Sequence, residues 1–299
     1  MNIIVPQNDW IVGTKYALMC DIKYSYTFYQ NGKPHIPEMN LFQFLEEVEK
    51  NSSNVISVYC KTEHASKLFN VLRRVDKKII LVTGCSDEPV NHDLFSQKPK
   101  NVIKWFGENV NYKHDDLIPT PLGSLVGSWI GNENIDPILC GHKDFIKIPT
   151  DGKKKENKNL MLMAFSLNTN FSSRTEVYNK FKDKSYVTNL CSNDNSNKLL
   201  TEYEFCQEIY NHKFVFSPEG NGIDCGRTWV AIQLGSIPIV KRSILTEYVE
   251  DKLPIFVYDS LEEVTQETLE KFKPKGTEYD LLSINYYKKR IDSLKDEFK

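Results

Sequence analysis

Residues 214–240 read FVFSPEGNGIDCGRTWVAIQLGSIPIV, and this stretch indicates how the second half of the chain folds. Three apolar residues stopped by Pro218 predict a short buried strand. A polar, glycine-rich loop follows, and then a helix from Arg227 to Leu234 that Gly235 ends. The apolar residues 237–240 predict the next strand. Strand, loop, helix and strand in this order are typical of a parallel α/β sheet.

The same alternation is found on both sides of this stretch. Apolar runs predict further strands at residues 2–5, 55–60, 78–83, 102–106, 160–165, 186–190 and 255–258. Helical spacing of apolar residues predicts helices at 41–50, 63–75, 174–181, 202–211 and 279–298. The run at 78–83 is almost continuously apolar, as expected for a strand covered on both faces. The sequence therefore predicts open, largely parallel α/β sheets throughout.

The length of the chain predicts two domains. Its 299 residues are about twice the usual domain size. Residues 151–159 contain no apolar residue and are suited to a linker. We therefore expect an N-terminal α/β domain at 1–150, a second one at 151–278 and a closing amphipathic helix at 279–299.

The charge and the cysteine content of the chain disfavour several classes of protein. The net charge of −2 and the pI near 6.3 do not indicate the basic surface that nucleic-acid binding needs. Seven cysteines without a CxxC pair are not typical of a disulfide framework or a zinc site, and they favour a reducing compartment. The sequence shows no secretion signal and no apolar run of 18 residues. We expect a soluble cytoplasmic protein without a membrane anchor and without a nucleic-acid partner.

Motif searches exclude several catalytic classes. The sequence has no GxxxxGK[ST], HExxH or GxSxG, which mark P-loop, zincin and α/β-hydrolase proteins. The glycines at 220, 222 and 226 miss the GxGxxG spacing of dinucleotide sites by one residue. No Asp-x-Asp triplet is present to hold a divalent metal on a diphosphate. We therefore expect neither a metal nor another cofactor.

The loop within residues 214–240 has the chemistry of a phosphate site. A strand that leads into a glycine-rich loop and a helix points backbone N–H groups and a helix N-terminus at one place. Arg227 adds a cation with a planar donor fork. Glu219 can accept hydrogen bonds from two sugar hydroxyls, whereas Asp224 can do this or cap the helix. A connection with a purely structural role has the same pattern, and both interpretations stay open.

The stretch also resembles the C-terminal donor-binding motif of exostosin-like glycosyltransferases and, more distantly, that of the α1,3-fucosyltransferases. In this motif Pro-Glu-Gly-x-Gly-x-Asp leads to an Arg and then to Leu-Gly-x-Ile-Pro-Ile-Val. Weaker similarity extends through residues 80–87, 104–109, 119–123 and 165–174. The chain departs from the motif at Gly226 and Val230, where relatives often have His and Glu, and this affects the identity of the donor most.

The resemblance implies a GT-B fold, in which two Rossmann-like domains face each other across a cleft and the C-terminal helix packs back on the first. It implies inverting, metal-independent transfer of a sugar from a nucleotide-sugar to a hydroxyl of a glycan acceptor. The donors that it implies are UDP-linked, with UDP-xylose as the first choice. Because large viruses encode soluble members of this family, the resemblance implies that the protein acts in the cytoplasm of a host cell. The donor-binding residues that it implies are Arg174, Ser217, Glu219, Gly220, Asn221, Gly222, Asp224 and Arg227.

An inverting transfer needs a general base for the acceptor hydroxyl, and in this fold the base comes from the first domain. Carboxylates near predicted strand ends or helix starts there are Asp87, Glu63 and Asp9, with Asp87 ranked first. Each of them also fits a turn or a helix cap. Three alternatives stay open: a fucosyltransferase that uses GDP-fucose, a catalytically silent glycan- or nucleotide-binding module, and an unrelated α/β enzyme.

Overall fold

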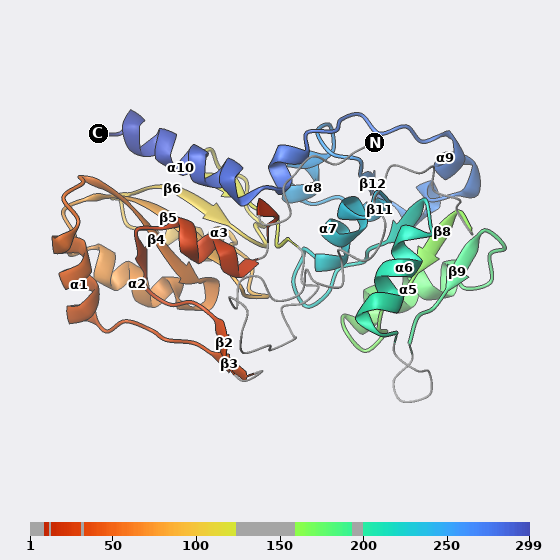
Figure 1. Ribbon diagram of the computed structural model, residues 1–299, viewed down its shortest axis with the longest axis horizontal. Coiled ribbons are helices and arrows are strands. Elements are labelled where there is room, and N and C mark those ends of the chain that lie inside the picture. The colour runs from red at the N-terminus through yellow and green to blue at the C-terminus, as the bar shows by residue number, and fades with distance from the viewer. Residues whose placement is uncertain (1–8, 12, 31–32, 124–158, 193–199) are drawn as a thin grey trace. The chain divides into compact units, whose positions relative to one another are not determined.

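The computed structural model describes residues 9–11, 13–30, 33–123, 159–192 and 200–299 (Figure 1). The described residues form two compact units, one of residues 9–123 with 280–299 and the other of residues 159–279. The domain boundary predicted at 150/151 and the strand predicted at 2–5 lie outside the described residues. The predicted α/β class is confirmed, because each unit is built on a parallel five-stranded sheet.

The first sheet adds its strands in one direction only. Its order follows the chain, β1 (Ile22–Lys23), β4 (Val55–Lys61), β5 (Lys78–Gly84), β6 (Val102–Gly107) and β7 (Leu117–Pro119). All four pairings are parallel. Because right-handed crossovers that always step the same way place their helices on one face, the second face must be covered by other segments.

Both faces of the first sheet are nevertheless buried. The helical segments of this unit are η2 (Gly13–Met19), α1 (Leu41–Lys50), η3 (Thr62–His64), α2 (Ala65–Leu72), α3 (His92–Ser96), η5 (Tyr279–Leu282) and α10 (Ile284–Glu297). Phe69 of α2 and Phe95 of α3 contact the buried Trp105 ring on one face. Tyr16 of η2 and Tyr287 of α10 pack on the other, and Figure 1 shows α10 and α2 on opposite sides of the strands.

The second sheet reverses direction. Its spatial order is β12 (Phe256–Tyr258), β11 (Ile237–Lys241), β10 (Phe214–Phe216), β8 (Met161–Met163) and β9 (Val187–Asn189), again with parallel pairing. The chain steps from β8 to β9 on one side, and then returns past β8 to add β10, β11 and β12 on the other. Crossovers in opposite directions place helices on both faces.

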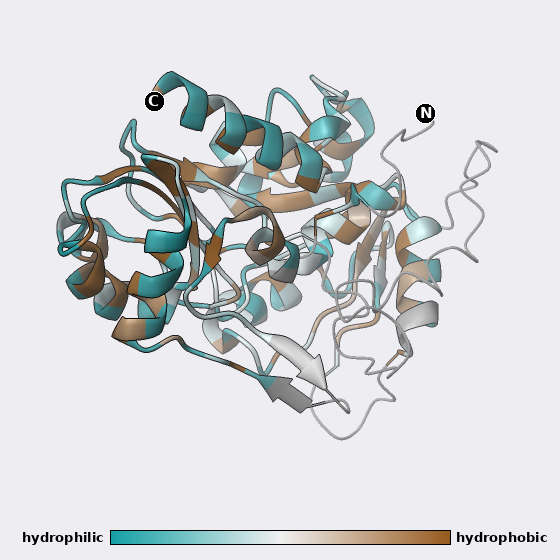
Figure 2. Cartoon of the chain, turned by 60° about the vertical axis from the view of Figure 1, so that its left-hand side comes forward, coloured by the Kyte–Doolittle hydropathy of each residue, from teal (hydrophilic) through white to brown (hydrophobic). Residues whose placement is uncertain are grey.

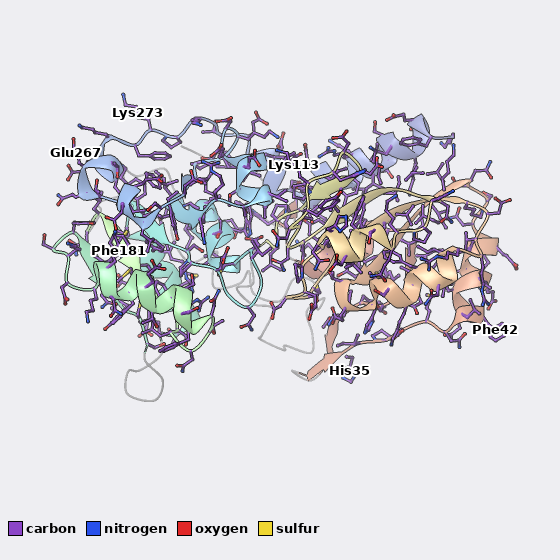
Figure 3. The ribbon with its side chains drawn as sticks, turned by 180° about the vertical axis from the view of Figure 1, so that it is seen from behind. His35, Phe42, Lys113, Phe181, Glu267 and Lys273 are labelled. Carbon is purple, nitrogen blue, oxygen red and sulfur yellow. The ribbon has the colours of Figure 1, made fainter. Side chains whose placement is uncertain are left out.

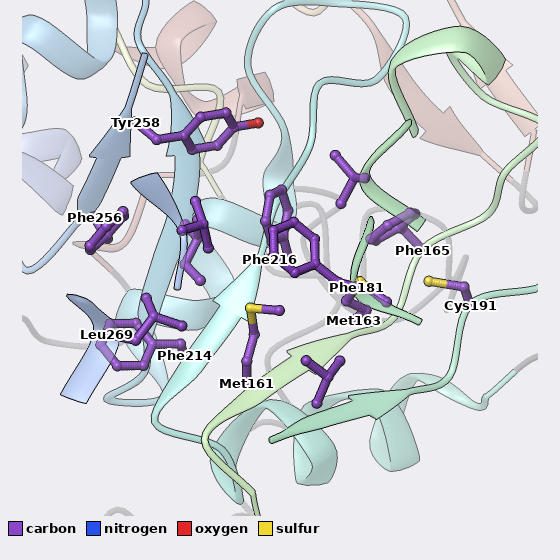
Figure 4. Close-up of a cluster of buried hydrophobic side chains, with 14 of the residues drawn as sticks. Met161, Met163, Phe165, Phe181, Cys191, Phe214, Phe216, Phe256, Tyr258 and Leu269 are labelled. Atoms are coloured by element: carbon purple, nitrogen blue, oxygen red, sulfur yellow. The ribbon is translucent and has the colours of Figure 1, made fainter. Parts of the chain in front are cut away.

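The helices of the second unit cover both faces as this topology requires. They are α5 (Phe171–Phe181), α6 (Glu202–Tyr210), α7 (Gly226–Gln233), α8 (Ile244–Val249), η4 (Leu261–Glu263) and α9 (Gln266–Lys271). Phe181 of α5 and Leu269 of α9 belong to one apolar cluster, which Figure 4 shows around β8 and β10. Ile209 of α6 and Val230 of α7 belong to a second cluster. Figure 2 shows the strands as mainly hydrophobic and the outer helices as mixed.

Several elements differ from their predicted bounds. The helix predicted at 63–75 is divided into η3 and the shorter α2, because Lys61–His64 make a tight 3₁₀ turn first. The helix predicted at 279–298 begins as η5, and Ser283 then caps α10. Strand β1 and the antiparallel hairpin of β2 (Phe28–Gln30) and β3 (Lys33–His35) were not predicted.

Candidate functional site

The second sheet has a switch point between β8 and β10. These strands are neighbours, but the chain leaves their carboxyl ends in opposite directions, toward β9 and toward β11. The loop after β8 leads into α5, and the loop after β10 leads into α7. Ligands of open α/β sheets bind in the crevice that such diverging loops create. This point is therefore the first place to search the second unit for a site.

Arg174 lies in the first turn of α5, beside this switch point. Its Nε donates to the carbonyl oxygen of Glu219 at 2.9 Å, and its Nη1 donates to that of Ser166 at 2.8 Å. The side chain is buried, with 5% of the residue exposed. Burial, and after it the charge of Arg227, lowers the pKa of the Arg174 guanidinium. Arg174 thus joins the two loops, and its charge is held in place.

Arg227 lies in the first turn of α7 and faces the same place from the other loop. Its Nε donates to the carbonyl oxygen of Ala164 at 3.1 Å. The guanidinium carbons of Arg227 and Arg174 lie 5.6 and 5.8 Å from the centre of the same Phe165 ring. Within the described residues, none of the ion pairs involves either arginine. Two cations without a carboxylate between them form a site for an anion of charge −2 or more.

The peptide of the loop after β10 passes close to these cations. A Cβ atom placed on Gly220 would lie 3.4 Å from Nη2 of Arg174. The side-chain amide of Asn170 donates to the carbonyl oxygen of Gly220 at 3.1 Å, and the Gly220 N–H donates to Gly222. Asn221 is exposed at the tip of the loop. Of the predicted donor-binding residues in this loop, Gly220 therefore lies beside the Arg174 guanidinium, and Asn221 and Gly222 follow it along the chain.

Two other predicted donor-binding residues have structural contacts instead. The carboxylate of Asp224 accepts hydrogen bonds from the Cys225 N–H at 2.7 Å and from Nε1 of Trp229 at 2.8 Å. Ser217 is buried, and its Oγ lies 2.9 Å from Oγ1 of Thr228. Both contacts fix the loop to the start of α7. Asp224 does not cap α7, whose N-cap residue is Cys225, but its carboxylate joins the loop to the Trp229 side chain.

Glu219 contributes its backbone to the cationic site. Its carbonyl oxygen accepts the Arg174 hydrogen bond described above. Burial, and after it the carboxylates of Glu219 and Glu176, raises the pKa of the Tyr258 phenol. Tyr258 was not among the predicted site residues. The sequence does place Tyr258 at the end of a predicted strand. It does not give the order of the strands, and without that order the position of this strand end in the sheet is unknown.

In the first unit, carboxylates gather where β4, β5 and β6 end. Glu63 follows β4, Asp87 follows β5 in an exposed turn, and Glu108 directly follows β6. Nζ of Lys61 lies 2.6 Å from Oε1 of Glu63. Burial raises the pKa of Glu63, but hydrogen bonds from Lys61 and Ser86 outweigh it and hold this pKa below its usual value. A carboxylate stabilised in this way is a weak base.

Glu108 was missed by the sequence reasoning and has the most restricted surroundings of these carboxylates. It is fully buried, and its Oε2 accepts a hydrogen bond from the Cys85 N–H at 2.8 Å. A Cβ atom on Gly84 would lie 2.7 Å from this carboxyl group, and one on Gly13 would lie 3.0 Å from it. The feature of the sequence that could have identified Glu108 is the run Gly107-Glu-Asn109, which directly follows an apolar strand.

Asp9, the third predicted base, is not joined to this group. It is partly exposed and precedes Trp10, which pairs with Ser283. No hydrogen bond or ion pair among the described residues links Asp9 with Glu63, Asp87 or Glu108. The structure therefore brings Glu63, Asp87 and Glu108 to one edge and leaves Asp9 without an interaction there.

Backbone strain marks the same two edges. Three described residues other than glycine have a positive φ: Cys85 at 51°, Asn109 at 51° and Asn170 at 48°. They follow β5, β6 and β8 respectively, all at carboxyl ends. Residues held in this region cost free energy and gather at functional sites. This distribution supports both edges as functional.

Comparison with known proteins does not add a family. No model of a protein family matches the chain, and no curated protein matches it.

In the part of the chain that the structure describes, no helix is long and apolar enough to cross a membrane. No group of three or more His, Cys, Asp or Glu side chains there is arranged to hold a metal ion.

Proposed function

We propose that the chain is a glycosyltransferase whose second unit binds the diphosphate of a nucleotide-sugar between Arg174 and Arg227. The observation that carries the proposal is the pair of guanidinium groups on one Phe165 ring at the switch point of a parallel sheet, neither of which forms an ion pair with a described residue. The N-termini of α5 and α7 add N–H groups and a partial positive charge to this place.

The same arrangement suits the departure of a diphosphate. Sugar transfer leaves negative charge on the leaving oxygen, and fixed cations stabilise this charge without reorganising. The two arginines can provide this stabilisation without a metal ion, so we propose metal-independent transfer. We further propose the GT-B arrangement, in which the acceptor and the base are supplied by the first unit.

For the base we propose a carboxylate at the ends of β4, β5 and β6. Asp87 is the strongest candidate, because it is exposed at this edge where an acceptor can reach it. Glu108 is oriented by the Cys85 N–H but is fully buried, and Glu63 is bound by Lys61. Direct attack of the acceptor oxygen on the anomeric carbon, with its proton passing to this carboxylate, would invert the configuration.

Nucleotide binding is the first test of the proposal. UDP, UDP-xylose, GDP and GDP-fucose are added without metal to wild type, Arg227→Ala and Arg242→Ala, and the melting temperature is measured. Arg242 is the matched control because its guanidinium is already paired with Glu250 and Asp259. A ligand at 100 times its Kd adds about 2.7 kcal/mol of stability.

We expect one nucleotide class to stabilise wild type and Arg242→Ala. In Arg227→Ala its Kd should rise by about 10- to 100-fold, because one charged hydrogen-bond partner is lost. If folded wild type is stabilised by none of the four compounds, the proposal is wrong. Release of UDP or GDP from the bound conjugate then separates an enzyme from a silent binding module.

A further inference from the structure

The loop that carries Asp87 is held at both of its ends by the residues that directly follow β6. At the start of the loop, the N–H of Cys85 donates to the buried carboxylate of Glu108 at 2.8 Å. At its far end, the N–H of the buried Val90 donates to the carbonyl oxygen of Asn109 at 3.1 Å. The loop therefore spans two points that the neighbouring strand end keeps in place.

Asn109 adds a third hydrogen bond in the middle of this loop. Only 3% of the residue is exposed, and its Nδ2 donates to the carbonyl oxygen of Ser86 at 2.9 Å. Ser86 directly precedes Asp87, and its Oγ accepts the N–H of Glu88, on the other side of Asp87, at 3.2 Å. Asp87 itself is exposed. Because the backbone is held on both sides of Asp87, its carboxylate can point only in a restricted range of directions.

The backbone at Asn109 is suited to this contact. Its φ is 51°, a conformation that glycine and asparagine adopt more readily than other residues. Of these two residues, only asparagine also supplies the amide that holds Ser86. Asn101, just before β6, has a similar buried role at the amino edge, where its Nδ2 donates to three backbone carbonyl oxygens at 2.9 to 3.2 Å. Of the two asparagines that flank β6, Asn109 is thus the one whose side chain binds the loop of Asp87.

We propose that Asn109 is a positioning residue, which holds Asp87 where it can take the proton of the acceptor. This inference rests on the proposed function, since it takes Asp87 to be the base. As the acceptor oxygen bonds to the anomeric carbon, its proton passes to the Asp87 carboxylate and the diphosphate leaves with the bonding electrons. A base must lie within about 2.6–3.2 Å of the hydroxyl that it deprotonates, so a displaced loop slows this step. The proposed donor site is in the second unit, so donor binding should not depend on Asn109.

The test measures the release of UDP or GDP from the sugar conjugate that wild type binds, with water as the acceptor. The variants are Asn109→Gly, Asp87→Asn and the two combined, and kcat and KM are determined beside the melting temperature. Asn109→Gly removes the amide but keeps a residue that tolerates the positive φ, so it should fold. Asn101→Ala is the matched control, because it removes an amide that binds backbone at the opposite end of the same strand.

We expect Asn109→Gly to lower kcat by about 10-fold with KM unchanged, and Asp87→Asn to lower it by about 100-fold or more. When Asp87 is already replaced, Asn109→Gly should lower kcat no further, because no base is left to position. Asn101→Ala should lower the melting temperature and leave kcat as in wild type.

The positioning role is overturned if Asn109→Gly leaves kcat unchanged, or lowers it equally with and without Asp87. A matching loss of kcat in Asn101→Ala also overturns it, because the effect would then be one of stability. If Asp87→Asn keeps full activity, or if wild type binds the conjugate without releasing nucleotide, the base and its positioning fail together while the arginine site stands. If wild type binds no nucleotide, the proposed function itself fails.

Discussion

In the part of the chain that the structure describes, each unit has one parallel five-stranded sheet, but the two sheets differ in the order in which the chain adds their strands. The first sheet grows in one direction and has no switch point among its described strands, whereas the second reverses between β8 and β10. In the second, loops diverge from adjacent strand ends and bring Arg174 and Arg227 together. In the first, the strand ends carry Glu63, Asp87 and Glu108 instead. The comparison teaches that the reversal brings two arginines together, while the sheet without one presents carboxylates at its strand ends.

The largest predicted effect is on the stability of the first unit, where α10 covers the second face of the sheet. Tyr287 of α10 is fully buried, and its ring meets that of Tyr16 edge to face at 5.7 Å. Tyr287→Ala should lower the free energy of unfolding of the first unit by about 3–5 kcal/mol, as for other large aromatic truncations. Hydrogen exchange measures each unit separately, and the exposed Lys289→Ala on the same helix is the control. Equal loss of protection in the second unit would contradict the division described here.

A second prediction compares glycines at the carboxyl edges of the two sheets. An added methyl group at Gly84 would meet the buried Glu108 carboxyl at 2.7 Å, whereas at Gly220 it would lie 3.4 Å from Arg174. Gly84→Ala should therefore cost about 1–3 kcal/mol through overpacking. Gly220→Ala should change stability by less than about 0.5 kcal/mol. Denaturant midpoints measure both, and a larger effect at Gly220 would show that the second edge is the more tightly packed one.

The smallest predicted effect is the pH dependence of the Lys61–Glu63 pair. The pKa of Glu63 is lowered in the folded state, so its contribution is present above the pKa of the unfolded chain, about 4.3, and is lost as pH falls through the folded value. Glu63→Gln should destabilise the protein at pH 7 by no more than about 1 kcal/mol, because the carboxylate is partly exposed. The difference from wild type should begin to shrink below the unfolded pKa of about 4.3 and vanish once pH has fallen through the lower folded pKa. A difference that grows on acidification would contradict this sign.

Local patterns predicted the elements that need only their own residues. Phe214–Phe216 forms β10 and Leu41–Lys50 forms α1 with the predicted bounds, the latter helped by the capping box of Asn40. Phe42, one of the apolar residues whose spacing predicts this helix, is nevertheless 81% exposed. Figure 3 shows its side chain at the outside of the unit. A strand of two residues such as β1 has no periodicity to detect, and only its pairing with β4 makes it a strand.

The candidate site was predictable only in part, for the same reason. The loop of residues 217–227 stood out because glycine and an arginine before a helix have a local signature. That Arg174 and Arg227 lie over one Phe165 ring depends on the order of the strands, and that Asp224 binds Trp229 depends on how the loop meets α7. Glu108 looks like any turn residue in the sequence, and only the structure shows it buried against Gly84.

The position of α10 also affects the order in which the units can be completed during synthesis. The ribosome delivers residues 159–279 before residues 284–297, yet these last residues pack on β4, η2 and their neighbours in the first unit. The second unit can therefore fold while the first still exposes Tyr59, Val82 and Phe106 on one face of its sheet. Domains usually complete in the order in which they emerge. Here the first unit begins to emerge from the ribosome before the second, but it completes its packing only after the second, when α10 has been synthesised.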